Sequence, residues 1–481
     1  MHFGAWNVRT LMDCATSDRP ERRTALVARE LQRYNIDIAA LSETRRPNEG
    51  QLKEAKGGYT FFWRGKDISE RRIHGVGFAI KNSLIPKLSE LPIGISERLM
   101  TLKLQLDKDQ HATVISAYAP TLDATDEVKE DFYSQLDTVL SAIPKRDKTI
   151  LLGDFNARVG RDNSLWSETI GKEGIGKINS NGELLLTNCA EHQLIITNTL
   201  FRQKNRYKTS WQHPRSRHWH LIDYVIVKVR DRSDVLLTRA MTGADDCWTD
   251  HRLIRAKMRI KLRPSKQNQN KPTRRKFNIG LLQDSTVNAD FQDCLLKNLP
   301  LQYPPSVYEH WNVLKTAITT ACTEVLGHQS KTHQDWFDEN DQEIQDLVEK
   351  KRLAGIAALN DPTSVDKSKM HRALKAQVQR ETRLLKNAWW VKKAKEIQYL
   401  ADTNNARAFF SATKAIYGPS TQGSVPIRSK DGRLLKTNEE ISHRWQEHYE
   451  ELLNRNPAIG ENVLCCIPQQ PTEASLNDPL N

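Results

Sequence analysis

Residues 149–157 read TILLGDFNA, an apolar run that gives way to polar side chains. The run Thr149–Leu152 is β-branched and aliphatic and is followed by a glycine, which is typical of a buried strand. Asp154 and Asn156 come soon after it, so we expect them at a strand end. Because Asp and Asn also favour ordinary turns, this stretch alone predicts only the strand. It indicates a functional site only if other strands of the chain end in the same way.

Five other apolar runs in the first 260 residues share the features of this strand. Each is four to seven residues long and is bounded by Gly, Pro, Asn or Asp or by polar residues; they are Ile36–Leu41, Gly75–Ile80, Met100–Leu106, Thr113–Tyr118 and Tyr224–Val227. Two stretches, Glu21–Tyr34 and Glu127–Ile143, place apolar residues on one stripe and predict helices. Many strands with few helices between them predict a layered α/β fold with substantial antiparallel sheet.

The character of the chain changes after residue 262. Arg263–Lys276 holds six basic and no acidic residues and lacks periodicity, which is typical of a linker or basic arm. Beyond it, apolar residues at three- and four-residue spacing predict helices over Pro305–Leu326, Gln334–Ala358, Lys367–Ala401 and Asn438–Leu453. We therefore predict an α/β domain over 1–262, a basic linker over 263–300, a helical region over 301–455 and a disordered tail over 456–481.

The net charge of +13 is concentrated in one part of the chain. Residues 201–276 hold 21 Lys and Arg against 6 Asp and Glu, so the rest of the chain is close to neutral. This predicts a polyanionic partner at that segment. No run of about 18 apolar residues occurs, so we expect neither a membrane-spanning helix nor a membrane partner. The seven cysteines form no CxxC pair, which fits a reducing compartment.

Polar side chains stand at or near the ends of several of the predicted strands. The segments that carry them are WNV, LSET, AYAP, GDFNA, IDY and TDH, and the side chains are Asn7, Glu43, Tyr118, Asp154, Asn156, Asp223, Asp250 and His251. Strand ends on one edge of a sheet converge, and sites form there. The competing interpretation makes Asn7 and Glu43 surface residues, and Tyr118 and His251 satisfied core residues.

These residue types suit metal-assisted phosphodiester hydrolysis. Oxygen ligands from Glu43, Asn7 and Asp250 suit Mg²⁺, with Mn²⁺ as the alternative. Asp154 could orient or deprotonate the attacking water, with Asn156 fixing that water. His251, held by Asp223, would be a charged donor to a phosphate oxygen. We expect no small-molecule cofactor, and the motifs leave the oligomeric state open.

Three other features of the sequence have weaker functional interpretations. His213, His218 and His220 with Cys247 fit no standard zinc spacing and have basic neighbours. Gly243–Asp246 lacks the aromatic residue of a polymerase metal hairpin and is expected to be a loop.

The third feature is the segment Lys369–Lys395, which has nine basic residues and one acidic residue, Glu381. It could be a solvated helix face or a nucleic-acid surface, and for Trp389 and Trp390 within it we favour a core position.

The ordered motif set resembles the endonuclease/exonuclease/phosphatase superfamily. The resemblance covers roughly residues 1–263 and implies a four-layer α/β sandwich, two packed mixed sheets flanked by helices, followed here by a mainly helical C-terminal region. The longer matches WNVRTL, LSETRR, GDFNARVG, HWHLIDYVIV and CWTDHRL are similar to RTE-type LINE retrotransposon endonucleases. They also resemble the craniofacial development protein 2-like group that derives from such elements.

The resemblance implies a role for each matching residue. Asn7 and Glu43 would lie at the metal, and Asp250 would help with the metal or the leaving group. Tyr118 and His251 would lie on the scissile phosphate. Asp154 would handle the nucleophilic water, with Asn156 beside it. Asp223 would orient His251.

Two positions depart from the family pattern. Apurinic/apyrimidinic endonucleases resemble WNVDG at the first motif, whereas here the residue after Val8 is Arg9. The residue two before Asp223 is often Arg in the family and is Leu221 here. Metal geometry and abasic-site preference therefore do not carry over from the resemblance.

The helical region has a resemblance of its own. KAIYGP, SKDGRLL and HRWQEHYEELLN look like the segment that joins endonuclease to reverse transcriptase in RTE-type elements, over roughly residues 336–454. The chain shows no F/Y-x-D-D hairpin, so we expect no polymerase activity.

The sequence favours a Mg²⁺-dependent phosphodiesterase, most simply an endonuclease that nicks DNA and leaves a 3′-hydroxyl. One alternative is a catalytically inactive, domesticated element fragment that binds nucleic acid. The other is a small-molecule or lipid phosphoesterase of the same superfamily. A DNA substrate predicts nuclear residence, with the cytoplasm as the alternative.

Overall fold

The computed structural model describes residues 1–13, 22–54, 56–71, 73–88, 90–107, 109–244, 247–262, 277–300, 306–327, 336–403, 405–416, 429–431, 435 and 438–454. The chain divides into two units, residues 1–424 and 425–481, which are described separately. The predicted basic arm 263–276 and the predicted tail 456–481 lie outside the described residues.

The first sheet of the larger unit has seven strands. Its β1 and β2 are parallel and every other neighbouring pair is antiparallel. The order is β16 (Val235–Ala240), β17 (Ile254–Met258), β1 (His2–Asn7), β2 (Ile38–Ser42), β5 (Val76–Lys81), β4 (Tyr59–Arg64) and β3 (Glu49–Glu54).

The second sheet has six strands, with β8 and β9 parallel and the other pairs antiparallel. The order is β12 (Leu194–Ile196), β15 (Asp223–Lys228), β9 (Lys148–Asp154), β8 (His111–Tyr118), β7 (Leu99–Gln105) and β6 (Ile93–Ser96). Two small ribbons pair β10 (Val159–Gly160) with β11 (Ile175–Ile178), and β13 (Trp211–Gln212) with β14 (Trp219–His220).

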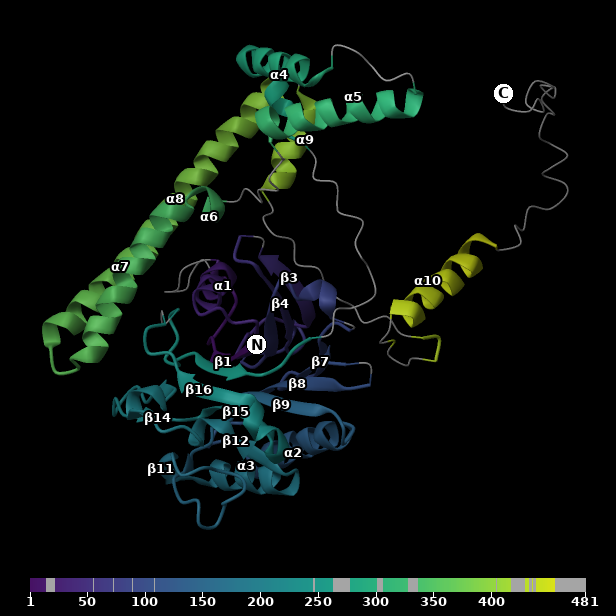
Figure 1. The fold of residues 1–481 in the computed structure, drawn as a ribbon. Helices are drawn as coiled ribbons and strands as arrows, with labels where there is room; N and C mark the ends of the chain where they lie inside the picture. Colours follow the sequence, from purple (N-terminus) through teal and green to yellow (C-terminus); the bar gives the residue numbers. More distant parts are fainter. Residues whose placement is uncertain are drawn as a thin grey trace, which may run out of the picture. The chain divides into compact units, whose positions relative to one another are not determined.

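The two sheets pack face to face, and helices cover their outer faces (Figure 1). Phe78 of the first sheet shares a core with Leu152 and Val225 of the second. The outer face of the second sheet packs against α2 (Asp126–Ser141) and α3 (Ser180–Glu191). The outer face of the first packs against α1 (Arg23–Arg33). The predicted four-layer α/β sandwich is confirmed.

The apolar run Thr149–Leu152 lies at the centre of this core. Ile150, Leu151 and Leu152 of β9 are all buried, because β9 lies between β15 and β8 and both of its faces are covered. A strand covered on both faces has no solvent side, so its sequence is continuously apolar rather than alternating. This explains why TILL and YVIV are readable as strands from the sequence.

Gly153 allows the backbone conformation at the end of β9. Its φ is +150°, and a Cβ there would lie 1.9 Å from the carbonyl oxygen of Ala117 on the neighbouring β8. We expect Gly153→Ala to lower the free energy of unfolding by about 2 kcal/mol or more, measured by urea denaturation. Gly58→Ala is the matched control, because Gly58 has φ +72° but open space around its Cβ position. Equal losses for the two variants would contradict the close approach to Ala117.

The C-terminal region is mainly helical, as predicted. The larger unit holds α4 (Ser285–Asn298), α5 (Val307–Ala321), α6 (Trp336–Glu339), α7 (Asp341–Asn360), α8 (Val365–Asp402) and α9 (Ala406–Ala415), and the smaller unit holds α10 (Asn438–Leu453). The helix α4 lies within residues 263–300, the range expected to be a basic linker. Asp284 begins this helix by accepting a hydrogen bond from the Thr286 amide, an N-cap that a basic-linker interpretation overlooks.

The helices α6 to α8 share a core with the α/β domain. Trp336, Phe337 and Val348 belong to the same buried cluster as Trp6 of β1 and Leu26 of α1. In Figure 1, α7 and α8 run side by side over most of the length of α7.

The two neighbouring tryptophans of α8 lie in different environments. Trp389 is buried in the cluster shared with the α/β domain, as expected, whereas Trp390 is 40% exposed, so its expected core position is wrong.

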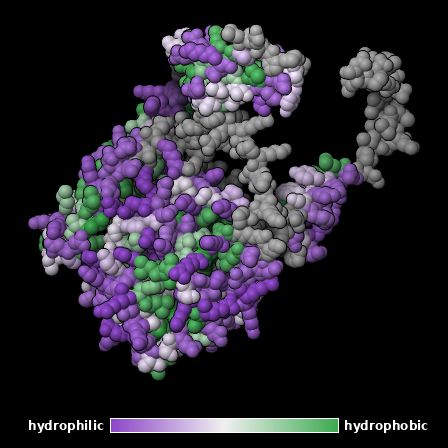
Figure 2. Space-filling view, in the orientation of Figure 1, coloured by the Kyte–Doolittle hydropathy of each residue, from purple (hydrophilic) through white to green (hydrophobic). Residues whose placement is uncertain are grey.

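The face of the protein drawn in Figure 2 is largely hydrophilic, with scattered apolar residues. Within the described residues, no helix is both long enough and apolar enough to cross a membrane.

Candidate active site

The polar side chains singled out in the sequence lie at the same edge of the two sheets. Asp154 closes β9 and is paired in register with Tyr118 on one side and with Asp223 on the other. In the other sheet, Asn7 closes β1 and pairs with Ser42, so Glu43 follows directly. The strand register therefore aligns three segments in one sheet and two in the other, all of them far apart in the sequence.

Asp154 is the centre of this group and is 1% exposed. Its Oδ2 accepts a hydrogen bond from Asn7 Nδ2 at 2.9 Å, and its Oδ1 accepts one from the Asn156 amide at 2.9 Å. Burial, reinforced by the nearby carboxylate of Asp223, raises the pKa of Asp154 well above its usual range. The carboxylate is thus fixed in position and unusually basic.

Glu43 joins the group from the first sheet. Its Oε1 accepts hydrogen bonds from Asn7 Nδ2 at 2.9 Å and from the Tyr118 hydroxyl at 3.2 Å, and its Oε2 pairs with Arg45 at 2.7 Å. Burial, helped by the charge of Glu43, raises the pKa of Tyr118, so its hydroxyl stays a neutral donor. Asn7 therefore bridges the two acidic residues.

His251 lies on the other side of Asp154. Its Nδ1 is 2.9 Å from Asp223 Oδ2, and its Nε2 is 3.9 Å from Asp154 Oδ2. Burial alone would lower the pKa of His251, but the charge and hydrogen bond of Asp223, with the charge of Asp154, raise it to about 9. The ring is therefore an imidazolium at neutral pH, held by one carboxylate and facing another.

The two remaining predicted residues lie at the border of the group. Asn156 has φ +47° and donates from Nδ2 to the Ala119 carbonyl, which ties it to the AYAP segment. Asp250 accepts a hydrogen bond from Trp211 Nε1 at 3.0 Å and lies 3.7 Å from Arg9 Nη1. The metal-ligand role expected for Asp250 stays a prediction, since its carboxylate faces a guanidinium.

Several supporting residues were not anticipated from the sequence. Thr249 Oγ1 donates to the Asn7 carbonyl and accepts from the His251 amide, so it ties the His251 loop to β1. Ser210 Oγ accepts from the amide of Asp223, and Asn198 Nδ2 donates to its carbonyl. Thr249 stands inside TDH and could have been noticed there. Ser210 and Asn198 lie in segments with no sequence signal.

Tyr118 also has neighbours that the sequence did not indicate. Arg98 donates from Nη1 to the Tyr118 carbonyl at 3.2 Å, and the ring centroid of His74 lies 6.0 Å from that of Tyr118. Burial and the charge of Arg98 lower the pKa of His74 to about 4, so His74 is neutral.

The chemistry of these donors fits a hard divalent cation. Carboxylate oxygens of Asp154 and Asp223 and a ring nitrogen of His251 all lie within 4.8 Å of one another, and the two carboxylates are the ligands of this set. Asp223 Oδ1 is buried and has no hydrogen-bond partner among the described residues, and Glu43 adds a further carboxylate nearby. Buried carboxylate oxygens in excess over cations are the donor set that Mg²⁺ or Mn²⁺ prefers.

The alternative zinc site finds no support among the described residues. His213 and His220 both lie against the Trp211 ring, whereas Cys247 is buried in the core cluster beneath the first sheet.

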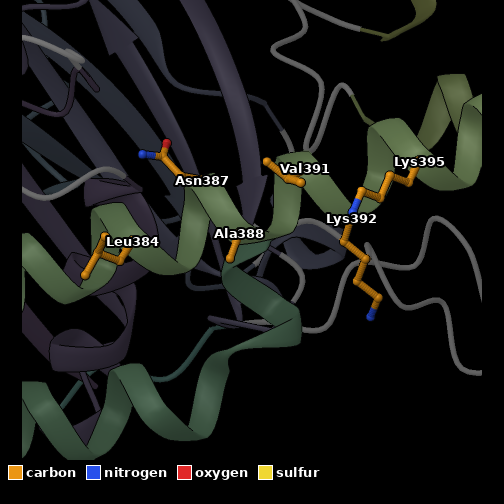
Figure 3. A pocket seen from close by; sticks show the side chains of 6 residues that line it. All are labelled: Leu384, Asn387, Ala388, Val391, Lys392 and Lys395. Carbon is orange, nitrogen blue, oxygen red and sulfur yellow. The ribbon is translucent and has the colours of Figure 1, made fainter.

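A surface hollow of about 590 Å³ on α8 does not have the residues of a phosphodiesterase site. Figure 3 shows its lining, which is Leu384, Asn387, Ala388, Val391, Lys392 and Lys395. Its lining lacks the carboxylates and the histidine that the group around Asp154 contains.

Known proteins resemble this chain over the range that contains the group. Residues 4–251 match the Endonuclease/Exonuclease/phosphatase family, and this range contains every residue of the group. Craniofacial development protein 2 of Bos taurus is 31% identical over 299 residues, which cover 62% of this chain and 46% of that protein. The protein of the same name from Tragulus javanicus is 32% identical over 264 residues, 54% of this chain and 42% of that protein. The chain thus spans less than half of the length of these curated relatives.

Solved structures show more distant similarity. The APE2 catalytic domain of Xenopus laevis is 17% identical, with a TM-score of 0.41, over 56% of this chain and 94% of that one. The endonuclease domain of TRAS1, a telomere-specific non-LTR retrotransposon, is 16% identical, with a TM-score of 0.37, over 54% of this chain and 99% of that one.

The resemblances predicted from the motifs, to the superfamily and to craniofacial development protein 2-like proteins, are confirmed. The family match spans about half of the chain, from β1 to His251. This chain belongs to the Endonuclease/Exonuclease/phosphatase family.

Proposed function

We propose that this protein is a magnesium-dependent endonuclease that nicks DNA and leaves a 3′-hydroxyl end. The observation that carries the proposal is the buried series Asn7–Asp154–His251–Asp223 at one edge of the sheets. Hydrolysis of a phosphodiester needs an activated water, a donor to the phosphate oxygens and compensation of the phosphate charge. The series offers a group for each need.

Asp154 is suited to activate the water. Its raised pKa makes it a stronger base than an exposed carboxylate, and two hydrogen bonds fix its orientation. A general base works best when its pKa approaches the working pH, because it then takes the proton readily and is still ionised beforehand.

His251 is suited to contact the phosphate. Asp223 holds Nδ1, which leaves the Nε2 proton directed toward the space beside Asp154. The imidazolium can donate to a phosphate oxygen and stabilise the charge that develops there. Tyr118, a neutral hydroxyl anchored on Glu43, is a second donor at the same edge.

Glu43, with Asn7 and Asp250, would hold the magnesium ion, which leaves the Asp154 carboxylate free to act as the base. When bound, a divalent cation compensates phosphate charge and lowers the pKa of water. Arg9, at the position where apurinic/apyrimidinic endonucleases resemble WNVDG, pairs with Asp250 and lies partly exposed, which suits contact with a phosphate.

The charge distribution favours DNA over a small phosphoester. The ribbon of β13 and β14 is attached to the site through Trp211, which donates to Asp250 and forms a bridge to His251. The loop at its tip exposes Arg215 and Arg217. Exposed arginines on a ribbon attached to the group fit a polyanion, whereas a small substrate needs a closed pocket. A DNA substrate would place the activity in the nucleus.

The test uses the full chain and supercoiled plasmid. We expect conversion to nicked circles with Mg²⁺ and none after EDTA, because the acidic group alone repels phosphate. A 3′-hydroxyl predicts that DNA polymerase extends the nicks without prior end repair. Plasmid binding without nicking at any Mg²⁺ or Mn²⁺ concentration would instead support the inactive, nucleic-acid-binding alternative. Release of phosphate from a lipid or sugar phosphate, with the plasmid intact, would support the small-molecule alternative.

A further inference from the structure

The loop that carries His251 has an unusual backbone. It joins β16 to β17 and contains Thr249, Asp250 and His251. Just before them, Cys247 has φ +42° and Trp248 has φ +61°. Two consecutive non-glycine residues in the left-handed region are costly and persist only when surrounding structure holds them.

The structure that holds this loop includes the helical hairpin of α7 and α8. Lys351 of α7 is 1% exposed, and its Nζ lies 3.6 Å from the centre of the Trp248 ring. Lys375 of α8 lies over the same ring at 5.7 Å. Two side chains also donate to the Gly243 carbonyl at the start of the loop, Arg33 of α1 and Arg352 of α7.

Trp248 is one residue from the groups that carry the chemistry. Thr249 Oγ1 donates to the Asn7 carbonyl at 2.8 Å and accepts from the His251 amide at 3.2 Å. Trp6, in the same buried cluster as Trp248, donates to the His251 carbonyl at 3.2 Å. A shift of the Trp248 ring would therefore move Asn7 and His251 relative to Asp154.

We propose that the α7–α8 hairpin is part of the catalytic apparatus, with Lys351 as a positioning residue that holds His251 in place through Trp248. This inference rests on the proposed nuclease function of the Asp154 site. A buried ammonium over an indole face is a strong contact, because no water competes for the cation. The helical region then acts on catalysis from the back of the first sheet, without touching the substrate.

The experiment compares Lys351→Met, Lys351→Arg and wild type in the full chain. Methionine keeps the length and apolar stem of lysine, so the hairpin keeps its packing while the cation is lost. Arginine retains a cation that can stack on the indole. Lys392→Met is the matched control, because Lys392 lies on the exposed side of α8. Val378→Ala loosens the same buried cluster without removing either cation over the Trp248 ring.

Two measurements are made on each variant. The first separates kcat from KM for plasmid nicking, and the second is hydrogen exchange of peptides covering residues 241–253. For Lys351→Met we expect a kcat about 10- to 100-fold lower with an unchanged KM, since misplacement by a fraction of an ångström costs rate rather than binding. Exchange in the loop should be faster, and Lys351→Arg should recover most of both losses.

Two results would overturn the inference while leaving the proposed function intact. In the first, wild type nicks plasmid, but Lys351→Met gives the same kcat and the same loop exchange as Lys392→Met. The other is an equal loss of kcat in Val378→Ala, which would mean that general packing, not the cation, supports the loop. If wild type fails to nick, the proposed function fails instead, and the exchange data still test the contact of Lys351 with the loop.

Discussion

Asp154→Asn is expected to lower kcat for plasmid nicking by about 10²- to 10⁴-fold, the range that one general base contributes. An amide cannot take the proton of the attacking water, whereas DNA binding through basic residues elsewhere is untouched. The variant should therefore retain its affinity for plasmid in a binding assay. Measured together, kcat and affinity separate the loss of chemistry from a loss of substrate.

The fold should survive this substitution. Asn7 and the Asn156 amide both donate to Asp154, so an amide at this position leaves one of these two donors without its acceptor. Removing a buried charge next to Asp223 offsets that cost. Asp162→Asn is the matched control, since Asp162 is an exposed carboxylate that contacts Ser164 within its own loop. Nicking by Asp154→Asn at the rate of Asp162→Asn would refute the assignment.

The second large effect is expected from His251→Gln. The variant loses the cation between Asp154 and Asp223, which leaves two buried carboxylates without compensation. We expect kcat to fall by about 10²- to 10³-fold, the usual cost of one charge-stabilising donor. We also expect the free energy of unfolding to fall by about 3 kcal/mol, because breaking a buried ion pair is strongly destabilising.

A double-mutant cycle isolates the electrostatic contribution of the Asp154–His251 pair to the free energy of unfolding. Adding Asp154→Asn to His251→Gln removes one of the two uncompensated charges, so the double variant should regain part of the lost stability but none of the activity. Strictly additive losses in the free energy of unfolding would contradict the coupling of Asp154 to His251. His443→Gln, on an exposed face of α10, controls for histidine replacement as such.

The strands that carry Asp154 and Asp223 could be predicted from the sequence because each is a continuous apolar run. The runs TILL and YVIV belong to strands covered on both faces, so apart from Thr149 they are apolar, and each run adjoins the polar group. Edge strand β3, with the sequence EGQLKE, has no such run and is defined only by pairing with β4. Its identity as a strand depends on a partner, which one segment of sequence does not show.

In the helical region, too, the elements could be predicted from the sequence, whereas their packing partners could not. The spacing of apolar residues predicted α8 to within a few residues, because periodicity is a property of the helix itself. That α6 to α8 bury Trp336, Phe337 and Trp389 against the outer face of the first sheet was not predicted. An amphipathic stripe indicates that a helix must be covered but does not identify what covers it.

The sequence by itself determined which residue types stand at the strand ends, because the motifs are contiguous and each follows an apolar run. Only the tertiary structure decided how they meet. Asn7 bridges Glu43 and Asp154, Asp223 holds His251, and Asp250 faces Arg9 and Trp211. These pairings join residues separated by up to 241 positions, and strand register and sheet packing set their distances. Burial and the charge of Asp223 raise the pKa of Asp154, and Asp223 raises the pKa of His251 against the effect of burial. Both shifts arise only when the chain has folded.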